Sequence, residues 1–376
     1  MPIALVTNYL PGYRLPLYRL LAEHLGVEVY CFGGEGSYVS EQQRDLDSQL
    51  ASAPFPAHAL PSQRDAFRLA ERHEAVIAGT TGRIALPAAY LGARRRGRPF
   101  LLWASLWRQP RTAAHLASFA LMRHLYRRAD AILTYGPHVS RYVARYRGSE
   151  SGVFVAPQCV EADLFGRDVT EAEVAAWRAE VGVPEGPLVL FAGRLVREKG
   201  IEVLLDAWRS MADSKANLCL IGDGPLRRKG VDGVGERVFF AGSLPRERLP
   251  VAYAAADVVV VPSIETRRFL EPWGLVCNEA MNQGRAVIAT TSVGAAAGGL
   301  VRDGETGLVV RAGDERALAG AIDGLLQDSV LRARLGSNGK AALEAYSYER
   351  AAAAFTRALE AAGATAASTG AGDSAR

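Results

Sequence analysis

The chain has 376 residues, 49% of them hydrophobic and 22% charged, with a formal net charge of +4 and a mean hydropathy near zero. This balance excludes a disordered chain. Charged residues also interrupt every apolar run before eighteen residues, which excludes a protein with membrane-spanning helices. The length exceeds that of one ordinary core and predicts two domains.

Cysteine and histidine usage indicates the compartment and the chemistry. The four cysteines stand singly in or beside predicted strands and helices, which favours reduced, buried thiols over disulfides. The N-terminal residues enter a strand directly, so we expect no signal peptide and a cytoplasmic protein. The six histidines form no metal-binding pattern, and the only Asp-x-Asp, at residues 45–47, lies in a polar segment that we interpret as surface. We therefore expect no metal site.

Charge is distributed unevenly along the chain. Residues 1–165 contain 19 Arg and no Lys against 13 acidic residues, whereas residues 166–376 contain 25 basic and 27 acidic residues. The basic runs at residues 94–98 and 123–128 suit anionic lipid headgroups, in a peripheral membrane contact, or a phosphorylated acceptor. The alternative is that they are solvated faces of an Arg-rich protein. Nucleic acid is not expected as a partner, because no aromatic-basic platform accompanies the charge.

Strands alternate with helices from the N-terminus, as in a parallel doubly wound sheet. We expect strands at residues 3–7, 27–32, 76–78, 100–103, 131–134 and 153–156, with helices at residues 15–24, 84–95 and 112–128. Residues 1–165 are thus predicted to form one Rossmann-like domain. Residues 166–186 mix turn residues with a short charged helix and are interpreted as a linker.

A second alternating set occupies residues 187–345. We expect strands at residues 188–192, 218–221, 238–240, 258–261, 286–290 and 308–310, with helices at residues 200–211, 246–255, 315–327 and 329–345. A terminal helix at residues 346–360 is expected to pack back on the first domain, and residues 361–376 are expected to be a disordered tail. The fold class is α/β, with two doubly wound sheets facing a central cleft lined by the ligand loops.

The segment between the strands at residues 258–261 and 286–290 is predicted to hold a capped helix. Pro272 suits the first helical position and Gly284 the residue just past the end. On one regular helix, Glu271 and Glu279 would lie about 80° apart in azimuth and roughly 12 Å apart along the axis. They could then reach two parts of one long ligand, beside helix amides that suit an anion.

The loop at residues 193–200 follows the first strand of the second set and precedes a helix. Its two cations, Arg194 and Lys199, suit the charge of a diphosphate. The alternative is that they pair with nearby carboxylates such as Glu198 or Glu202. The chain has no P-loop, and no GxGxxG follows a strand, so nicotinamide and flavin cofactors lose their main support.

Four segments, in this order and spacing, carry a resemblance to a known family: FAGRLVREKGIEVLLDAW, LCLIGDGPLR, VFFAGSLPRERLPVAYAAADVVVVPS, and EPWGLVCNEAM with the sequence that follows it. They resemble the donor domain of retaining family 4 glycosyltransferases (glycosyl transferases group 1), which have the GT-B fold. The likeness covers about residues 131–327. Before the predicted linker, residues 155–165 resemble a weaker family signal, from which Gln158 and Glu161 depart conservatively.

The resemblance implies transfer of a hexosyl group from a nucleotide diphosphate sugar to an acceptor hydroxyl, with retention at the anomeric carbon and with no cofactor or metal. It implies that residues 1–165 bind the acceptor and residues 187–345 the donor. In the catalytic set, Arg194 and Lys199 neutralise the diphosphate and Glu271 contacts the transferred sugar, while Glu279 binds the ribose. The other implied donor-binding residues are Gly193, Gly222, Leu244, Ser263, Gly274, Leu275 and Val276.

Departures from the family pattern leave several roles open. Glu265 competes with Glu271 for the sugar, although the spacing to Glu279 and the following Pro-Trp-Gly favour Glu271. The first loop lacks the family's Gly-Gly pair, and residues 102–108 lack a histidine that is common there. The candidates on the acceptor side are therefore Gly12, Tyr13, Arg14, Ser105, Trp107 and Arg108. The acceptor itself is left open as a small molecule, a glycan or a lipid-linked sugar.

Two other functions are compatible with the same fold. A nucleotide-sugar 2-epimerase would need no acceptor, and a catalytically silent module would bind the donor without transfer. The EPWGLVCNEAM motif and its spacing favour transfer over epimerisation. The four charged residues of the donor motifs argue against a silent module.

Overall fold

The computed structural model describes residues 1–33, 45–211, 215–227 and 237–364. It divides into two compact units. Unit 1 holds Met1–Trp107, Leu116–Cys159 and Tyr348–Arg376, and unit 2 holds Arg108–His115 and Val160–Ser347. The tail predicted at residues 361–376 lies from residue 365 onward outside the described residues.

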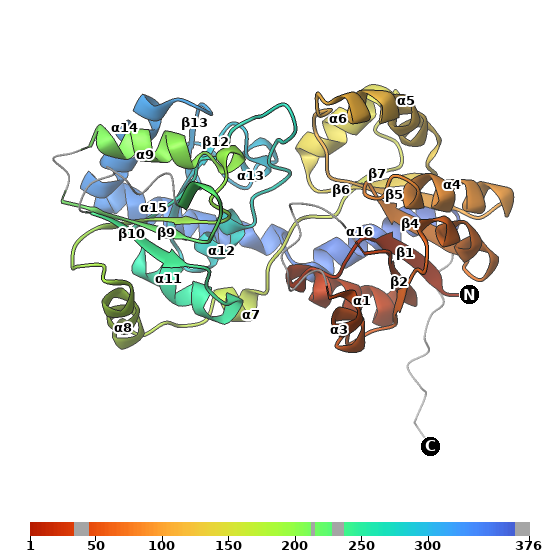
Figure 1. Ribbon diagram of the computed structural model, residues 1–376, viewed down its shortest axis with the longest axis horizontal. Coiled ribbons are helices and arrows are strands. Elements are labelled where there is room, and N and C mark those ends of the chain that lie inside the picture. The colour runs from red at the N-terminus through yellow and green to blue at the C-terminus, as the bar shows by residue number, and fades with distance from the viewer. Residues whose placement is uncertain (34–44, 212–214, 228–236, 365–376) are drawn as a thin grey trace, which may run out of the picture. The chain divides into compact units, whose positions relative to one another are not determined.

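Unit 1 is built on a seven-stranded parallel sheet of order β3-β2-β1-β4-β5-β6-β7 (Figure 1). Its strands are β1 (Ile3–Thr7), β2 (Val27–Cys31), β3 (Ala57–Ala59), β4 (Ala75–Gly79), β5 (Phe100–Ala104), β6 (Ala131–Thr134) and β7 (Val153–Val155). The central strands are buried on both faces, which explains why they read as continuous apolar runs.

Helices cover both faces of this sheet. One face carries α1 (Leu15–Leu25) and α16 (Tyr348–Ala361), and the other carries η2 (Gln63–Glu71), α4 (Ala85–Arg95), α5 (Ala113–Arg128) and α6 (Pro137–Arg147). The remaining elements are η1 (Gly12–Arg14) and α3 (Leu46–Ala51). The predicted doubly wound architecture is confirmed, while β3, α3, η2 and α6 were not predicted.

Unit 2 has a six-stranded parallel sheet of order β10-β9-β8-β11-β12-β13. Its strands are β8 (Leu188–Ala192), β9 (Asn217–Ile221), β10 (Val238–Gly242), β11 (Val258–Val261), β12 (Ala286–Thr290) and β13 (Leu308–Val310). Helices α9 (Ile201–Arg209) and α14 (Glu315–Gln327) lie on one face, and α11 (Leu249–Ala255) and α12 (Val276–Asn282) on the other (Figure 1). The other elements are α7 (Ala162–Phe165), α8 (Glu171–Val181), η3 (Arg197–Lys199), η4 (Arg246–Arg248), α13 (Gly294–Ala297), α15 (Ser329–Ala342) and η5 (Leu343–Ala345).

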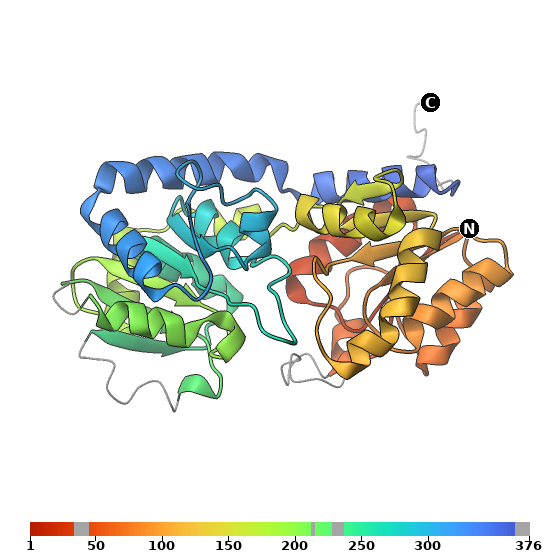
Figure 2. The same ribbon diagram turned by 90° about the horizontal axis from the view of Figure 1, so that it is seen from above.

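The last helix belongs to unit 1 (Figure 2, blue, before the grey trace). The Phe355 ring of α16 meets the ring of Trp103 edge to face, with 5.1 Å between centroids. At the start of the same helix, the Tyr348 hydroxyl donates to the Tyr13 carbonyl oxygen over 2.7 Å. Packing of α16 therefore fixes the loop that follows β1.

Residues 166–186, which the sequence suggested as a linker, lie within unit 2. Helix α8 buries Trp177, and the Arg178 guanidinium donates to the Ala255 carbonyl oxygen at the end of α11 over 3.1 Å. This segment is therefore packed against α11. Among the described residues, no helix is long and apolar enough to cross a membrane.

The predicted start of the helix after β11 is wrong. Helix α12 begins at Val276, four residues later than the position given to Pro272. Glu271 instead has extended backbone that bridges to Val293, and Gly274 then turns the chain with a φ of 93°. Glu271 is therefore outside the helix that carries Glu279, and the angle and rise expected for the pair on one helix do not apply. Gly284, with a φ of 64°, does follow the helix end.

Candidate active site

The loops after β8 and β9 are locked together at the carboxyl end of the unit 2 sheet. The Gly193 amide donates to the Ile221 carbonyl oxygen over 2.9 Å, and the Leu195 amide to the Asp223 carbonyl oxygen over 2.8 Å. A Cβ on Gly222 would lie 1.9 Å from the Gly193 carbonyl oxygen, so only glycine allows this approach. The predicted residues Gly193 and Gly222 thus build one wall of the site.

The predicted cation Lys199 and the predicted carboxylate Glu271 meet in an ion pair. The same carboxylate oxygen accepts a hydrogen bond from the Ser263 hydroxyl over 3.1 Å, and Glu271 is only 6% exposed. The two loops are also tied through their backbones, because the Ile264 amide donates to the Glu198 carbonyl oxygen over 3.0 Å. Three residues from two loops therefore form one polar cluster at the ends of β8 and β11.

Arg194 lies in the same loop, with 38% of its side chain exposed. Its guanidinium is 3.8 Å from the Glu198 carboxylate, so the alternative of pairing with a neighbouring carboxylate does occur for Arg194. An exposed pair at this distance contributes little to stability. Little free energy is therefore lost if a more highly charged anion displaces Glu198 as the partner of Arg194.

Glu279 accepts a hydrogen bond from the Tyr253 hydroxyl over 2.5 Å. Burial raises the pKa of Glu279, and the Tyr253 hydrogen bond and the charge of Arg246 oppose that rise. Burial also raises the pKa of Tyr253 well above its usual value, with a further contribution from Glu279. The carboxylate predicted to bind ribose is therefore partly desolvated and fixed in position by a neighbouring helix.

Residues 161–167, where the chain enters unit 2, make further contacts that support the Glu279 carboxylate. The Arg246 guanidinium pairs with Glu161 at 2.7 Å and lies 5.6 Å from the centre of the Phe165 ring. At the end of α12, the Gln283 side-chain amide donates to the carbonyl oxygens of Phe165, over 2.5 Å, and Arg167, over 2.9 Å. The helix that carries Glu279 is thus anchored to residues 161–167.

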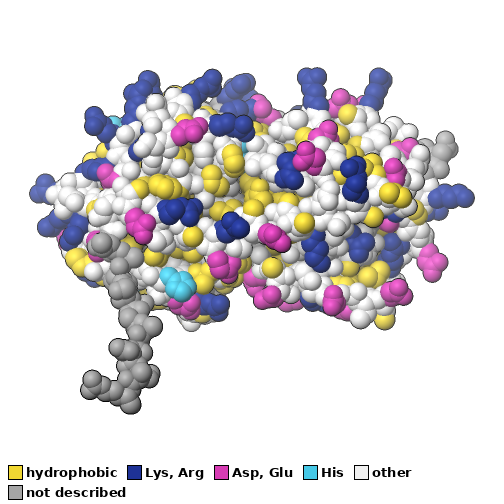
Figure 3. All heavy atoms as spheres, turned by 180° about the vertical axis from the view of Figure 1, so that it is seen from behind, with side chains coloured by type: hydrophobic (Ala, Val, Ile, Leu, Met, Phe, Trp, Pro, Cys, Tyr) yellow, Lys and Arg dark blue, Asp and Glu magenta, His cyan; other side chains and the backbone are white. Residues whose placement is uncertain are grey.

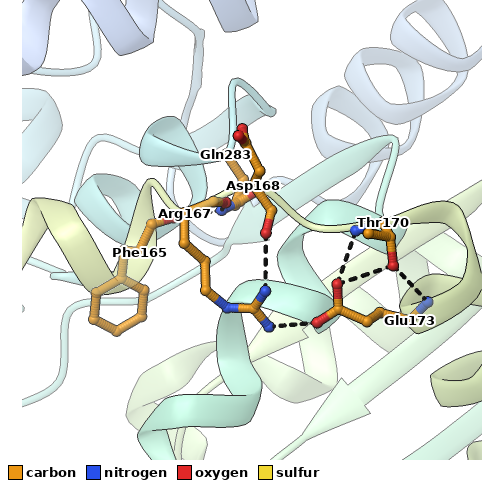
Figure 4. Close-up of polar contacts among 6 residues, drawn as sticks. All are labelled: Phe165, Arg167, Asp168, Thr170, Glu173 and Gln283. Atoms are coloured by element: carbon orange, nitrogen blue, oxygen red, sulfur yellow. Dashed lines mark hydrogen bonds and ion pairs between the residues drawn. The ribbon is translucent and has the colours of Figure 1, made fainter.

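Figure 4 shows how that anchoring segment is itself held. The Arg167 guanidinium pairs with Glu173 at 2.8 Å, and Glu173 also accepts from the Thr170 amide over 2.9 Å. The Thr170 hydroxyl in turn accepts from the Glu173 amide, which completes a capping box at the start of α8. The backbone bonds to Thr170, followed by the ion pair with Arg167, hold the pKa of Glu173 at about 2.

The backbone before α12 presents polar hydrogens. Within the described part of the chain, the amides of Gly274, Leu275 and Val276 donate to no acceptor. A Cβ added at Gly274 would lie 3.7 Å from the Cγ of Glu271. The predicted amides therefore lie beside the polar cluster of Lys199, Ser263 and Glu271. Leu244, also predicted to shape the donor pocket, lies partly exposed two residues after β10.

The structure separates the two competing glutamates. Glu265 is half exposed and forms an ion pair with Arg108, which belongs to the same unit, and the Arg108 guanidinium also donates to the Thr266 carbonyl oxygen over 3.0 Å. Glu271 is buried and pairs with Lys199. Glu271 thus shares a cluster with the other donor-site candidates, whereas Glu265 pairs with a residue predicted for the acceptor side.

In unit 1, Arg14 lies in an aromatic cage. Its guanidinium carbon is 4.4 Å from the centre of the Trp103 ring, 5.3 Å from that of Tyr135 and 5.4 Å from that of Tyr13. The guanidinium also donates to the Tyr135 hydroxyl. Arg14 therefore holds the loop that contains Gly12 against β5 and β6.

The other acceptor candidates follow β5. The Ser105 hydroxyl lies 3.4 Å from that of Thr80, and the Trp107 ring meets the buried His138 ring edge to face at 5.2 Å. A histidine is thus present beside Trp107, supplied by α6 from the end of β6. This histidine was not predicted, because it lies outside the segment of residues 102–108 where one was expected. The sequence does give one signal for it: His138 follows Gly136 and Pro137, which come shortly after the end of β6.

The basic run at residues 94–98 is partly neutralised. Arg94 pairs with Asp130 at 3.1 Å and Arg96 with Glu71 at 2.7 Å. Figure 3 shows Lys and Arg side chains interspersed with Asp and Glu on the face that it draws. These pairs agree with the solvated-face interpretation, and membrane contact stays a prediction. No group of three or more His, Cys, Asp or Glu side chains within the described ranges is arranged to hold a metal ion.

Two doubly wound parallel sheets, with cations and carboxylates at the strand ends of the second, define the class of GT-B glycosyltransferases. A structural comparison supports the fold: HepE from Anabaena, solved in complex with UDP and glucose, superposes with a TM-score of 0.76 at 19% identity, covering 96% of this chain and 99% of that one.

Sequence comparison gives the family. Residues 173–342 match the family of glycosyl transferases group 1. The GDP-mannose-dependent alpha-(1-6)-phosphatidylinositol monomannoside mannosyltransferase of Mycolicibacterium smegmatis is 32% identical over 68% of this chain and 69% of its own length. A D-inositol 3-phosphate glycosyltransferase of Xylanimonas cellulosilytica is 34% identical over 60% of this chain, which spans only 56% of that relative. The chain belongs to the glycosyl transferases group 1 family.

Proposed function

We propose that this protein moves a hexosyl group from a nucleotide diphosphate sugar to an acceptor hydroxyl, with retention of the anomeric configuration. The observation that carries the proposal is the cluster of Lys199, Glu271 and Ser263, with Arg194 in the same loop, at the carboxyl ends of β8 and β11. Cations beside a buried carboxylate suit a ligand with a charged middle and hydroxylated ends.

Each side chain has a role in this reaction. Arg194 and Lys199 neutralise the diphosphate, Glu271 accepts hydrogen bonds from hydroxyls of the transferred sugar, and Glu279 binds the ribose. The bond between the anomeric carbon and the diphosphate oxygen breaks, and the acceptor oxygen bonds to that carbon on the same face. The departing phosphate oxygen takes the acceptor's proton. The protein stabilises the charge that builds on the leaving group.

The relatives' names support the substrate classes. One is a GDP-mannose-dependent enzyme acting on a phosphatidylinositol mannoside, and another is a lipopolysaccharide core glycosyltransferase. The fold neighbour HepE is also known with UDP-glucose. We therefore place the acceptor among small molecules, glycans and lipid-linked sugars, and the enzyme in the cytoplasm, at the membrane surface when the acceptor is a lipid. Two cations at the diphosphate make a metal or another cofactor unnecessary in this mechanism.

The test is a screen of UDP- and GDP-sugars for thermal stabilisation, followed by incubation of the binding donor with candidate acceptors. A donor at 100 times its dissociation constant stabilises by about 2.7 kcal/mol. We expect a product whose anomeric proton coupling matches that of the donor, with unchanged rate in excess EDTA. Conversion of donor alone to its 2-epimer would overturn transfer in favour of an epimerase. Binding without turnover of any acceptor or of water would indicate a silent module.

A further inference from the structure

A polar cavity lies in unit 2, at the amino ends of β11 and β12. It has a volume of about 490 Å³, and its charged lining consists of Arg285, Arg332, Lys340 and Asp257. Asp257 directly precedes β11 and Arg285 directly precedes β12. The candidate active site follows the carboxyl ends of β8 and β11, so in this parallel sheet the cavity is at the opposite end.

The single carboxylate that lines this cavity is already engaged. One Asp257 oxygen accepts from the Leu188 amide over 2.9 Å, and the other pairs with the Arg332 guanidinium at 3.3 Å. Arg332 also donates to the Leu325 carbonyl oxygen over 2.6 Å. Asp257 and Arg332 thus serve the ends of β8 and α14. Two cations, Arg285 and Lys340, remain in the cavity.

Arg285 is partly buried, and its Nε is shielded from solvent without a hydrogen-bond partner. Within the described ranges, the side chains of Arg285 and Lys340 form no ion pair and no hydrogen bond. Burial lowers the pKa of Arg285, and Asp257 opposes that effect from a distance. A desolvated guanidinium is costly unless an anion pairs with it. The cavity therefore presents positive charge that the described protein does not neutralise.

Helix α15 lines the cavity along most of its length. Ser329, its first residue, lines the cavity. Asp328 caps the Leu331 amide over 2.8 Å, while the amides of Ser329 and Val330 have no acceptor in the described part of the chain. Ser329 and Lys340 lie roughly 16 Å apart along the helix axis, so these amides border the end of the cavity that is far from Lys340.

The cavity wall is closely packed. A Cβ on Gly336 would lie 2.0 Å from the Gly284 carbonyl oxygen, so α15 contacts the turn before β12 backbone to backbone. Gln283, which also lines the cavity, is held by its bonds to Phe165 and Arg167. The backbone of Arg285, in the same turn, is thereby held close to α15.

We propose that this cavity binds a small soluble anion carrying a phosphate group, held by the Arg285 guanidinium and the Lys340 ammonium. A phosphate offers several acceptor oxygens to these two cations, and Arg can contact it through two parallel hydrogen bonds. This site is separate from the donor site and does not depend on the proposed transfer reaction.

The test is calorimetric titration of the full chain with inorganic diphosphate at low ionic strength. Because the proposed donor site also binds diphosphate, the titration is run on R194Q/K199Q, which removes the donor-site cations. We expect this protein to retain one binding event. Adding R285Q/K340Q should weaken that event at least tenfold, whereas the matched control R334Q, an exposed cation on α15 outside the cavity, should leave it unchanged.

Two results would overturn the inference. One is the absence of diphosphate binding in R194Q/K199Q, and the other is binding that R285Q/K340Q leaves intact. Circular dichroism and the melting temperature show whether each variant is folded, and R285K, which keeps the charge, should retain most of the affinity if R285Q/K340Q is unstable. Failure of the transfer assay would not bear on these outcomes, since no sugar or acceptor is present.

Discussion

Lys199 and Glu271 form an ion pair although 72 residues separate them in the chain. Lys199 ends η3 after β8, and Glu271 lies in the extended segment after β11, and these two strands are neighbours in the sheet. The pair therefore exists because adjacent parallel strands deliver their loops to one edge. It joins the residue proposed to bind the diphosphate to the one proposed to bind the sugar.

Replacing Lys199 by Met should lower kcat by 10² to 10³, because a preorganised donor at a developing negative charge is worth roughly 3 to 4 kcal/mol. The variant also leaves the buried Glu271 carboxylate without its cation, so the free energy of unfolding should fall by about 1 to 3 kcal/mol. Steady-state kinetics with the identified donor and urea unfolding measure the two effects. Arg197→Gln is the control, since this loop cation is 77% exposed. A kcat within threefold of wild type for K199M would contradict the assignment.

The two competing glutamates are distinguished by a matched pair of substitutions. Glu271→Gln should weaken donor binding, and with it kcat/KM, roughly 100-fold. The buried carboxylate is proposed to accept hydrogen bonds from the sugar, each worth about 1.5 to 3 kcal/mol when one partner is charged. Glu265→Gln removes only an ion pair to Arg108 and should change donor affinity less than threefold. Donor binding by calorimetry, with no acceptor present, isolates the effect. The reverse order of effects would assign the sugar to Glu265.

Sequence patterns predicted the strands of unit 2 well because they are uninterrupted apolar runs. Val258 to Val261 and Ala286 to Thr290 are buried on both faces, and burial is what such runs indicate. The pairing of Lys199 with Glu271 was not predictable from spacing, because it depends on which strands are neighbours. The helix start was misplaced since Pro272 satisfies the local rule for a first turn, while the bridge from Glu271 to Val293 overrides it.

Residues that act through tertiary contact had little local signal. Tyr253 lies inside a helix of small apolar residues and reads as core, yet its hydroxyl holds Glu279. Arg246 looks like one of several surface cations in its segment, and only the fold brings it to Glu161. The aromatic cage of Arg14 draws on β5 and β6, which no pattern near residue 14 could reveal.

Gly222→Ala should destabilise the protein by roughly 1 to 3 kcal/mol and weaken donor binding. The new Cβ would lie 1.9 Å from the Gly193 carbonyl oxygen, at a backbone φ of 125°. The loops after β8 and β9 must then separate, which displaces Arg194. Gly304→Ala is the control, since its φ of 70° is also positive but its Cβ would meet nothing within 4 Å. Equal losses of donor affinity in the two variants would show that the loop contact is irrelevant to binding.

Glu279→Gln should make the unliganded protein more stable at neutral pH while weakening donor binding. Burial raises the pKa of Glu279 above the value of about 4.3 expected in the unfolded chain, so the folded state holds its proton more tightly. The carboxyl's contribution to stability is therefore greatest below pH 4.3 and declines as pH rises through the raised pKa.

A glutamine carries no such penalty. The difference in unfolding free energy between E279Q and wild type should consequently grow in favour of the variant from pH 4 to pH 7, as measured by urea unfolding at fixed ionic strength. Glu247→Gln, an exposed glutamate on η4, serves as the control. Parallel curves for E279Q and wild type would contradict the burial argument. Donor KM should rise roughly 10- to 100-fold, the worth of a hydrogen bond to a charged group. Together, these two results would show that the Glu279 carboxylate lowers the stability of the unliganded protein and is retained for donor binding.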